Sequence, residues 1–247
     1  MSLTARPNTA TSLDARELAA LIDISAVQAF HGEQDVRALA AIAAAEGFVA
    51  AHVLPNFVPL LRSLLPRDGA TMVGGPVGFP SGGHTTKTKV AEAVGLVADG
   101  AQEADMMINV GRLKSNDLAY VRDDIRAVVE AIAPVPLKVI LELAHLTDDE
   151  IRRGAAIVAE SGAAFVKTGT GWIPGAPAPD RLQLILDTVD GAVEVKASGG
   201  IRSLDAVAQM VRLGVTRFGI NTKVAVDLVR QCAALPGGRL HLAGEPA

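Results

Sequence analysis

Residues 164–171 read Ala-Phe-Val-Lys-Thr-Gly-Thr-Gly, and residues 193–200 read Val-Glu-Val-Lys-Ala-Ser-Gly-Gly. Each stretch begins as a short apolar run and ends in glycine, which is typical of a buried strand followed by a tight loop. A helix is predicted between them, over Arg181–Val189. A strand, a helix and a second strand in this order indicate a unit of parallel sheet.

The same alternation continues outward from these two stretches to both ends of the chain. The other predicted strands are Leu21–Ile24, Phe48–Val53, Thr71–Gly75, Ala104–Asn109, Leu137–Leu141 and Thr216–Ile220, which with Ala164–Lys167 and Val193–Lys196 make eight. The other predicted helices are Gln34–Glu46, Thr86–Asp99, Leu118–Ile132, Thr147–Ser161 and Ser203–Leu213. Eight strand–helix pairs in 247 residues, with no domain-sized linker, predict a closed (β/α)8 TIM barrel.

An open, doubly wound sheet is the alternative fold, and local signals argue against it. Such a sheet needs a phosphate-binding loop after its first strand, but Ile22-Asp23-Ile24-Ser25 contains none. Several predicted helices end at a glycine, as expected for left-handed caps, and Thr147 with Glu150 forms a capping box. We therefore expect one barrel domain over residues 13–247, preceded by a loose arm over residues 1–12.

Composition and charge limit the classes of function. The chain is 49% hydrophobic but 3% aromatic, which suits parallel strands covered by helices. Its net charge is −4 without a basic patch, so nucleic acid and membrane are not expected partners. The single cysteine, Cys232, forms no internal disulfide, and the first twenty residues lack the apolar run of a signal peptide. These features predict a cytoplasmic protein.

Two lysines interrupt apolar strands and are the strongest chemical signal in the chain. Lys167 and Lys196 fall at matching places on neighbouring predicted strands, each followed by a glycine-bearing loop. Burial lowers the pKa of a lysine, and a second ammonium nearby lowers it further. Since a neutral lysine amine is a nucleophile for carbonyl groups, the pattern predicts Schiff-base chemistry rather than two solvated strand ends.

An acidic residue and a third lysine extend this candidate site. Asp105 enters the apolar strand of residues 104–109, where an acid serves as a proton carrier or an ion-pair partner. Lys138 opens the next strand, and such a lysine is usually solvated or structurally paired; it could hold Asp105 in place.

The loops after the last two strands predict a phosphate site. In many barrels these loops bind phosphate through backbone N–H groups and a helix N-terminus. The residues expected there are Ser198, Gly199, Gly200, Asn221 and Thr222, and the loop after the sixth strand adds Thr168, Thr170 and Gly171. Two ordinary tight turns remain the alternative interpretation.

Histidines near strand ends leave a metal-dependent lyase open as an alternative. His52, His84 and His145 fall near such ends, but no pair has helical ligand spacing and no cysteine joins them. We therefore expect no metal ligands and no organic cofactor.

At these residues the chain resembles the deoxyribose-phosphate aldolase family, the Schiff-base aldolases of the (β/α)8 fold. The resemblance runs from about Ala51 to Thr222. Its motifs are Val77-Gly78-Phe79-Pro80-Ser81-Gly82, Glu103-Ala104-Asp105-Met106-Met107-Ile108-Asn109, Phe165-Val166-Lys167-Thr168-Gly169-Thr170-Gly171 and Val195-Lys196-Ala197-Ser198-Gly199-Gly200-Ile201-Arg202. Several motifs in one order are far more specific than any one of them.

The resemblance implies a role for each catalytic candidate. Lys167 corresponds to the imine-forming lysine, and Lys196 to the second lysine that lowers its pKa. Asp105 corresponds to the acid of the proton relay, with Lys138 pairing to it. The substrate so implied is 2-deoxy-D-ribose 5-phosphate, cleaved to acetaldehyde and D-glyceraldehyde 3-phosphate. A homodimer is also expected by this resemblance.

The chain departs from the family pattern at the substrate end. The family's lysine loop usually reads Lys-Thr-Ser-Thr-Gly, whereas Gly169 replaces the serine, and Trp172 adds bulk. Asn221 and Thr222 stand where two serines are common, and the only tyrosine, Tyr120, lies in a predicted helix. Two alternatives stay open beside the metal-dependent lyase: a Schiff-base aldolase for a different aldehyde or sugar acid, phosphorylated or not, and a non-catalytic barrel that binds a sugar phosphate.

Overall fold

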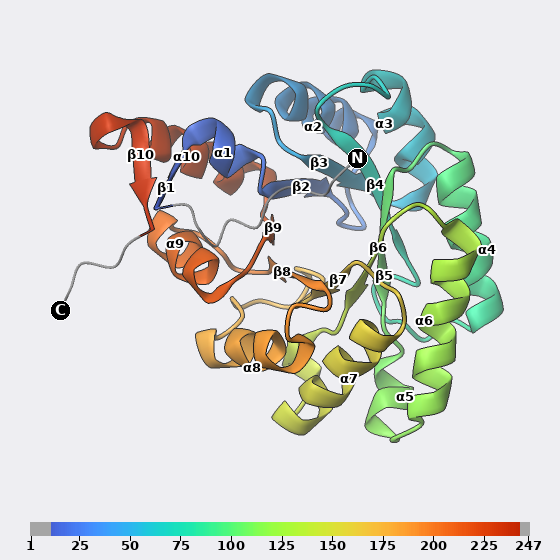
Figure 1. The fold of residues 1–247 in the computed structure, drawn as a ribbon. Helices are drawn as coiled ribbons and strands as arrows, with labels where there is room; N and C mark the ends of the chain where they lie inside the picture. The colour runs from blue at the N-terminus through green and yellow to red at the C-terminus, as the bar shows by residue number, and fades with distance from the viewer. Residues whose placement is uncertain (1–10, 243–247) are drawn as a thin grey trace.

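Eight parallel strands close into a barrel in the computed structural model, which describes residues 11–242 (Figure 1). In chain order the strands are β2 (Ile22–Ala26), β3 (Ala50–Val53), β4 (Met72–Val77), β5 (Glu103–Met107), β6 (Leu137–Ile140), β7 (Phe165–Lys167), β8 (Glu194–Ser198) and β9 (Arg217–Gly219). Strand β9 pairs with β2 and so closes the ring. The predicted TIM barrel is confirmed, and each of the eight predicted strands overlaps an observed one.

Helices form the outer layer of the barrel (Figure 1). They are α2 (Glu33–Glu46), α3 (Val58–Leu64), α4 (Thr86–Ala98), α5 (Val110–Lys114), α6 (Leu118–Ile132), α7 (Asp148–Glu160), α8 (Pro179–Val189), α9 (Leu204–Leu213) and α10 (Thr222–Ala233). The predicted helix ends are close because the caps are local: Gly47 and Gly214 adopt the left-handed conformation, and Thr147 with Glu150 forms the expected capping box.

A small sheet outside the barrel ties the two ends of the described chain together. Strand β1 (Ser12–Asp14) pairs antiparallel with β10 (Arg239–His241), and helix α1 (Ala15–Ala19) follows β1. Because Ser12 already pairs with His241, the predicted boundary between arm and barrel at residue 13 falls inside β1. Residues 1–10 of the predicted arm lie outside the described residues.

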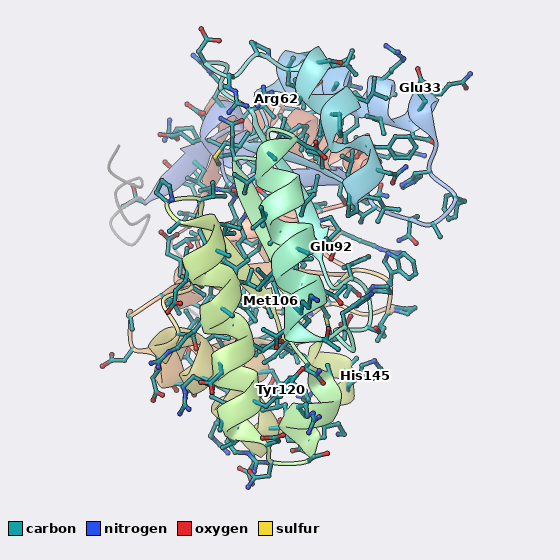
Figure 2. All side chains as sticks on the ribbon, turned by 90° about the vertical axis from the view of Figure 1, so that its right-hand side faces the viewer. Glu33, Arg62, Glu92, Met106, Tyr120 and His145 are labelled. Atoms are coloured by element: carbon teal, nitrogen blue, oxygen red, sulfur yellow. The ribbon has the colours of Figure 1, made fainter. Side chains whose placement is uncertain are left out.

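The core combines an aliphatic shell between strands and helices with charged side chains inside the barrel. Lys138 and Lys196 are among the largest fully buried side chains, together with Phe48 and Phe218. Charge is also buried between helices: α4 and α6 lie side by side (Figure 2), and Lys89 Nζ on α4 is 2.6 Å from Asp124 Oδ2 on α6. Within residues 11–242, no helix combines the length and apolar character needed to cross a membrane.

Candidate active site

Strand register brings the predicted catalytic residues of β5 to β8 together inside the barrel. Lys167 is paired directly with Lys196 across β7 and β8, and Asp105 with Lys138 across β5 and β6. Neighbouring positions in a parallel sheet point to the same face, so each pair enters the barrel together. The prediction that the two lysines lie close together is confirmed.

Asp105 is the centre of this group. Its Oδ2 atom accepts hydrogen bonds from Lys167 Nζ at 2.8 Å and Lys196 Nζ at 2.7 Å, while Lys138 Nζ is 3.2 Å from Oδ1. Lys138 is fully buried, not solvated, because it reaches the interior from the strand beside Asp105. One carboxylate thus contacts all three lysines of the predicted site.

A second set of charged residues extends the network deeper into the barrel. Arg217 Nε lies 2.5 Å from Asp23 Oδ1, and Arg217 Nη2 lies 2.8 Å from Glu103 Oε2. Asp23 Oδ2 also lies 2.5 Å from Lys196 Nζ, and Glu103 Oε1 lies 2.5 Å from Lys138 Nζ. Lys138 and Lys196 therefore join the two sets.

Glu103 and Arg217 were not predicted as site residues, and only Glu103 carried a signal in the sequence. Glu103 precedes Asp105 by two residues, so the period of a strand places both on the same face. The place of Arg217 opposite Lys196 becomes visible only in the register of β8 and β9.

The charges of this network balance when Lys167 is neutral. The carboxylates are Asp23, Glu103 and Asp105, and the cations other than Lys167 are Lys138, Lys196 and Arg217. Charged Lys167 would add a fourth cation to three carboxylates, and an uncompensated buried charge is costly. The surroundings therefore disfavour the protonated form of Lys167 relative to an exposed lysine.

The pKa values of the two paired lysines shift in opposite directions. Burial, helped by the charges of Lys196 and Lys138, lowers the pKa of Lys167 to about 8, although Asp105 opposes the shift. Burial would also lower the pKa of Lys196, but Asp105, Asp23 and Glu103 outweigh it and raise that pKa. Three lysine charges outweigh burial at Asp105, whose pKa lies well below its usual range. Lys167 is thus the lysine that loses its proton first.

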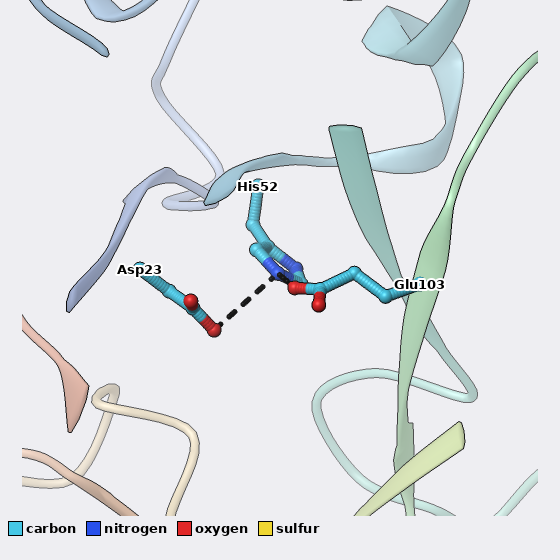
Figure 3. A group of neighbouring side chains, drawn as sticks. All are labelled: Asp23, His52 and Glu103. Carbon is cyan, nitrogen blue, oxygen red and sulfur yellow. Dashed lines mark hydrogen bonds and ion pairs between the residues drawn. The ribbon is translucent and has the colours of Figure 1, made fainter. Parts of the chain in front are cut away.

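The His52 ring points toward Glu103 and Asp23 (Figure 3) and packs against a glycine of β4. Its Nε2 atom lies 2.7 Å from Glu103 Oε1 and 3.7 Å from Asp23 Oδ2. A Cβ added to Gly74 on β4 would lie 2.4 Å from Cε1 of the imidazole ring. Glycine at position 74 is therefore needed to admit the ring, which the sequence analysis did not foresee.

The group in Figure 3 has the residue types of a metal site but not its charge balance. Asp23, His52 and Glu103 each bring one ligand atom within 4.8 Å of the others. However, both carboxylates already contact buried cations, so a divalent ion would meet positive charge at close range. This donor set fits an ion-pair network better than a metal centre.

Lys167 and Lys196 line a cavity of about 580 Å³ toward the carboxyl ends of the strands. Lys167, with 11% of its side chain exposed, meets this space from the β7 side. The other predicted residues that line it are Asp105, Thr170, Gly171, Lys196, Ser198, Gly199, Gly200 and Asn221. Most of the predicted site therefore surrounds one cavity.

Three predicted site residues do not line this cavity. Lys138 lies beneath it in the charged network. The Thr168 hydroxyl donates to Ser198 O at 3.0 Å and accepts from Ser198 N at 2.9 Å, which joins β7 to β8. The Thr222 hydroxyl donates to the carbonyl oxygen of Ser25. These two hydroxyl groups are thus engaged by the backbone.

The fold and this cavity define a barrel enzyme whose site holds a buried lysine of low pKa, and comparison with known proteins gives its family. The family profile described as "DeoC/LacD family aldolase" matches residues 11–221. The chain belongs to this aldolase family, and aldolases are lyases.

Similar proteins agree in sequence and in structure. The deoxyribose-phosphate aldolase of Rhizobium meliloti (strain 1021) is 77% identical over 95% of this chain and 94% of its own. The corresponding enzyme of Klebsiella pneumoniae is 48% identical over 88% of this chain and 90% of its own. A solved structure described as a putative deoxyribose-phosphate aldolase from Coccidioides immitis superimposes with a TM-score of 0.84 at 32% identity, covering 89% of this chain and 87% of that one. The resemblance identified from sequence motifs is therefore confirmed.

Proposed function

We propose that this enzyme cleaves 2-deoxy-D-ribose 5-phosphate to acetaldehyde and D-glyceraldehyde 3-phosphate through an imine on Lys167. The observation that carries the proposal is the pairing of Lys167 with Lys196 across β7 and β8. Relative to the usual lysine value, the pKa of Lys167 is lowered to about 8 and the pKa of Lys196 is raised. An imine enzyme needs one amine that can lose its proton at working pH, next to charges that stay fixed. The named substrate of the relatives supplies the choice of sugar.

Imine formation starts from the neutral amine. Lys167 attacks C1 of the open-chain aldehyde, and the resulting carbinolamine loses water to give a protonated imine. At pH 7 roughly one amine in ten is neutral for a pKa of about 8, so the lysine is partly active near neutrality rather than fully deprotonated. Burial contributes most to this shift, and Lys196 adds to it.

Carbon–carbon cleavage uses the imine as an electron sink. Asp105, as a carboxylate, accepts the proton of the C3 hydroxyl group through a water, and the C2–C3 electrons move toward the imine nitrogen. D-glyceraldehyde 3-phosphate leaves, and an enamine remains on Lys167. Return of the proton to C2 and addition of water to the imine release acetaldehyde. Protons and water therefore balance over the cycle.

The phosphate is proposed to bind over β8 and β9. Gly199 and Gly200 both have positive φ, 97° and 58°, in the loop after β8. Asn221 caps the N-terminus of α10, where backbone N–H groups favour an anion. Arg202 lines the same part of the cavity and supplies a positive charge. We propose that Gly171, in the loop after β7, also contributes to the phosphate site. The hydroxyl groups of Thr168 and Thr222 do not contact phosphate in this proposal, because they bond to the backbone.

A Schiff-base aldolase for an unphosphorylated aldehyde is the second candidate. The observation that favours it is the engagement of the Thr168 and Thr222 hydroxyl groups with backbone, which leaves fewer side-chain donors for phosphate. Comparing kcat/KM for 2-deoxyribose 5-phosphate with that for 2-deoxyribose separates the two substrates. A metal-dependent lyase predicts inactivation by a strong chelator, and a non-catalytic barrel predicts binding without turnover.

The decisive experiment is borohydride trapping with 2-deoxyribose 5-phosphate, followed by peptide mass mapping. We expect a reduced adduct on Lys167 in the wild-type protein and none on that peptide in Lys167→Leu. The position should tolerate leucine, since the side chain is mostly buried. Turnover by the folded variant at a wild-type rate, or an adduct on another lysine alone, would contradict the assignment.

A further inference from the structure

Trp172 reaches across the mouth of the barrel. It belongs to the loop after β7, yet its Nε1 donates to Val27 O, in the loop after β2, at 3.2 Å. Its ring meets that of Phe79, in the loop after β4, edge to face at a centroid distance of 5.4 Å. Since β2 and β4 flank β3, and β3 and β7 lie on opposite sides of the ring, the indole spans the opening.

The backbone of Trp172 is anchored by the residues that precede it. Trp172 N donates to Thr170 Oγ1 at 3.0 Å, and the Thr170 hydroxyl donates to the buried carboxylate of Glu142. Gly171, between them, has φ 78°, a conformation that favours glycine. The direction of the indole is therefore set from both ends.

The indole lies between two parts of the cavity. The part beside β2 to β4 combines the apolar groups Val27, Pro76 and Phe79 with polar side chains, which are Asp23, Ser25, Gln28, His31 and His52. The part beside β8 and β9 combines apolar side chains with Asn221 and the cation Arg202. Lys167, on β7, is nearer to β8 and β9 than to β2 to β4 in strand order.

We propose that Trp172 determines which acceptor aldehydes this aldolase accepts, by closing the β2–β4 side and directing the substrate from Lys167 toward β8 and β9. The inference rests on the proposed imine chemistry and adds a residue that selects among its substrates. A compact, phosphorylated acceptor extends toward Arg202 and Asn221, whereas a rigid apolar ring needs the space that the indole fills.

The test runs the reaction toward synthesis, with acetaldehyde as donor. Benzaldehyde lacks a hydrogen on the carbon next to its carbonyl, so it acts only as an acceptor; D-glyceraldehyde 3-phosphate is the reference acceptor. We expect Trp172→Ala to raise the kcat/KM ratio of benzaldehyde to the reference by roughly tenfold or more, since pocket space of this kind discriminates by such factors. Trp172→Phe, which keeps an aromatic wall, should stay within about threefold of wild type by the same reasoning.

Phe79→Ala removes the ring that packs against Trp172 and so enlarges the same part of the cavity. It serves as the second variant if Trp172→Ala does not fold. An unchanged ratio in the folded alanine variants, including no benzaldehyde product, overturns the inference. Borohydride trapping of acetaldehyde on Lys167 in every variant separates the two proposals: if wild-type protein gives no adduct, the imine chemistry itself fails, and this inference fails with it.

Discussion

Lys167 and Lys196 lie side by side on β7 and β8, and their ammonium groups meet the same atom, Oδ2 of Asp105. Their surroundings differ in one respect. Lys196 has a second carboxylate, Asp23, at 2.5 Å, whereas Lys167 ends at the cavity with Asp105 as its one carboxylate contact among the described residues. One extra carboxylate thus distinguishes the fixed charge from the amine that gives up its proton.

The pH dependence of the wild-type enzyme follows from the lowered pKa of Lys167. The neutral amine is the reactive form, so the rate of imine trapping should rise with pH and level off above a midpoint of about 8. For an unperturbed lysine, with its pKa of 10.5, the rate of trapping would still be rising at pH 10. Single-turnover trapping across pH 6–10 is the measurement, and a midpoint near 10 would refute the shift.

Replacing Lys196 should move this midpoint upward. Lys196→Met removes a positive charge beside Lys167 and leaves Asp105 and Asp23 with one cation fewer, so the protonated form of Lys167 becomes more stable. We expect trapping at pH 7 to fall about tenfold for each unit of upward pKa shift and to recover partly at higher pH. Lys196→Arg keeps the charge and is the matched control. A lower rate with an unchanged midpoint would assign Lys196 to positioning alone.

Removing the shared carboxylate should destabilise the fold. Asp105→Asn removes the carboxylate that three buried lysines share, and breaking a buried pair costs about 3–5 kcal/mol. The free energy of unfolding from urea titration at pH 7 measures this loss. Glu33→Gln breaks the exposed pair with Arg37, whose side chains are 61% and 53% exposed, and should cost less than about 1 kcal/mol. Similar losses in both variants would show that the buried network contributes little.

Gly74 and His52 should be coupled in stability. Gly74→Ala places a Cβ against the imidazole ring, so the ring has to move from Glu103, at a cost of about 1–3 kcal/mol. In the background of His52→Ala the same change has space, and its cost should largely disappear. A double-mutant cycle from urea unfolding gives the coupling free energy. Additive effects would mean that the ring does not constrain position 74.

Much of the fold could be predicted because its determinants are local. The eight strands, the glycine caps and the capping box at Thr147 each depend on a few consecutive residues. The pairing of Lys167 with Lys196 could be anticipated for a related reason: each lysine has the same place in its own strand, and parallel register keeps such places adjacent.

Period, caps and motifs along the chain predict the barrel and the aldolase family resemblance, and the resemblance already assigns Lys167 as the reactive lysine beside Lys196 and Asp105. The tertiary structure adds the physical reason why Lys196 keeps its charge: Asp23 contacts both Lys196 and Arg217, which is 194 residues away, and the latter contact forms when β9 closes onto β2. It also decided that Trp172 crosses to Val27 and Phe79. Contacts across a barrel depend on closure and side-chain direction, and neither is encoded in local sequence pattern.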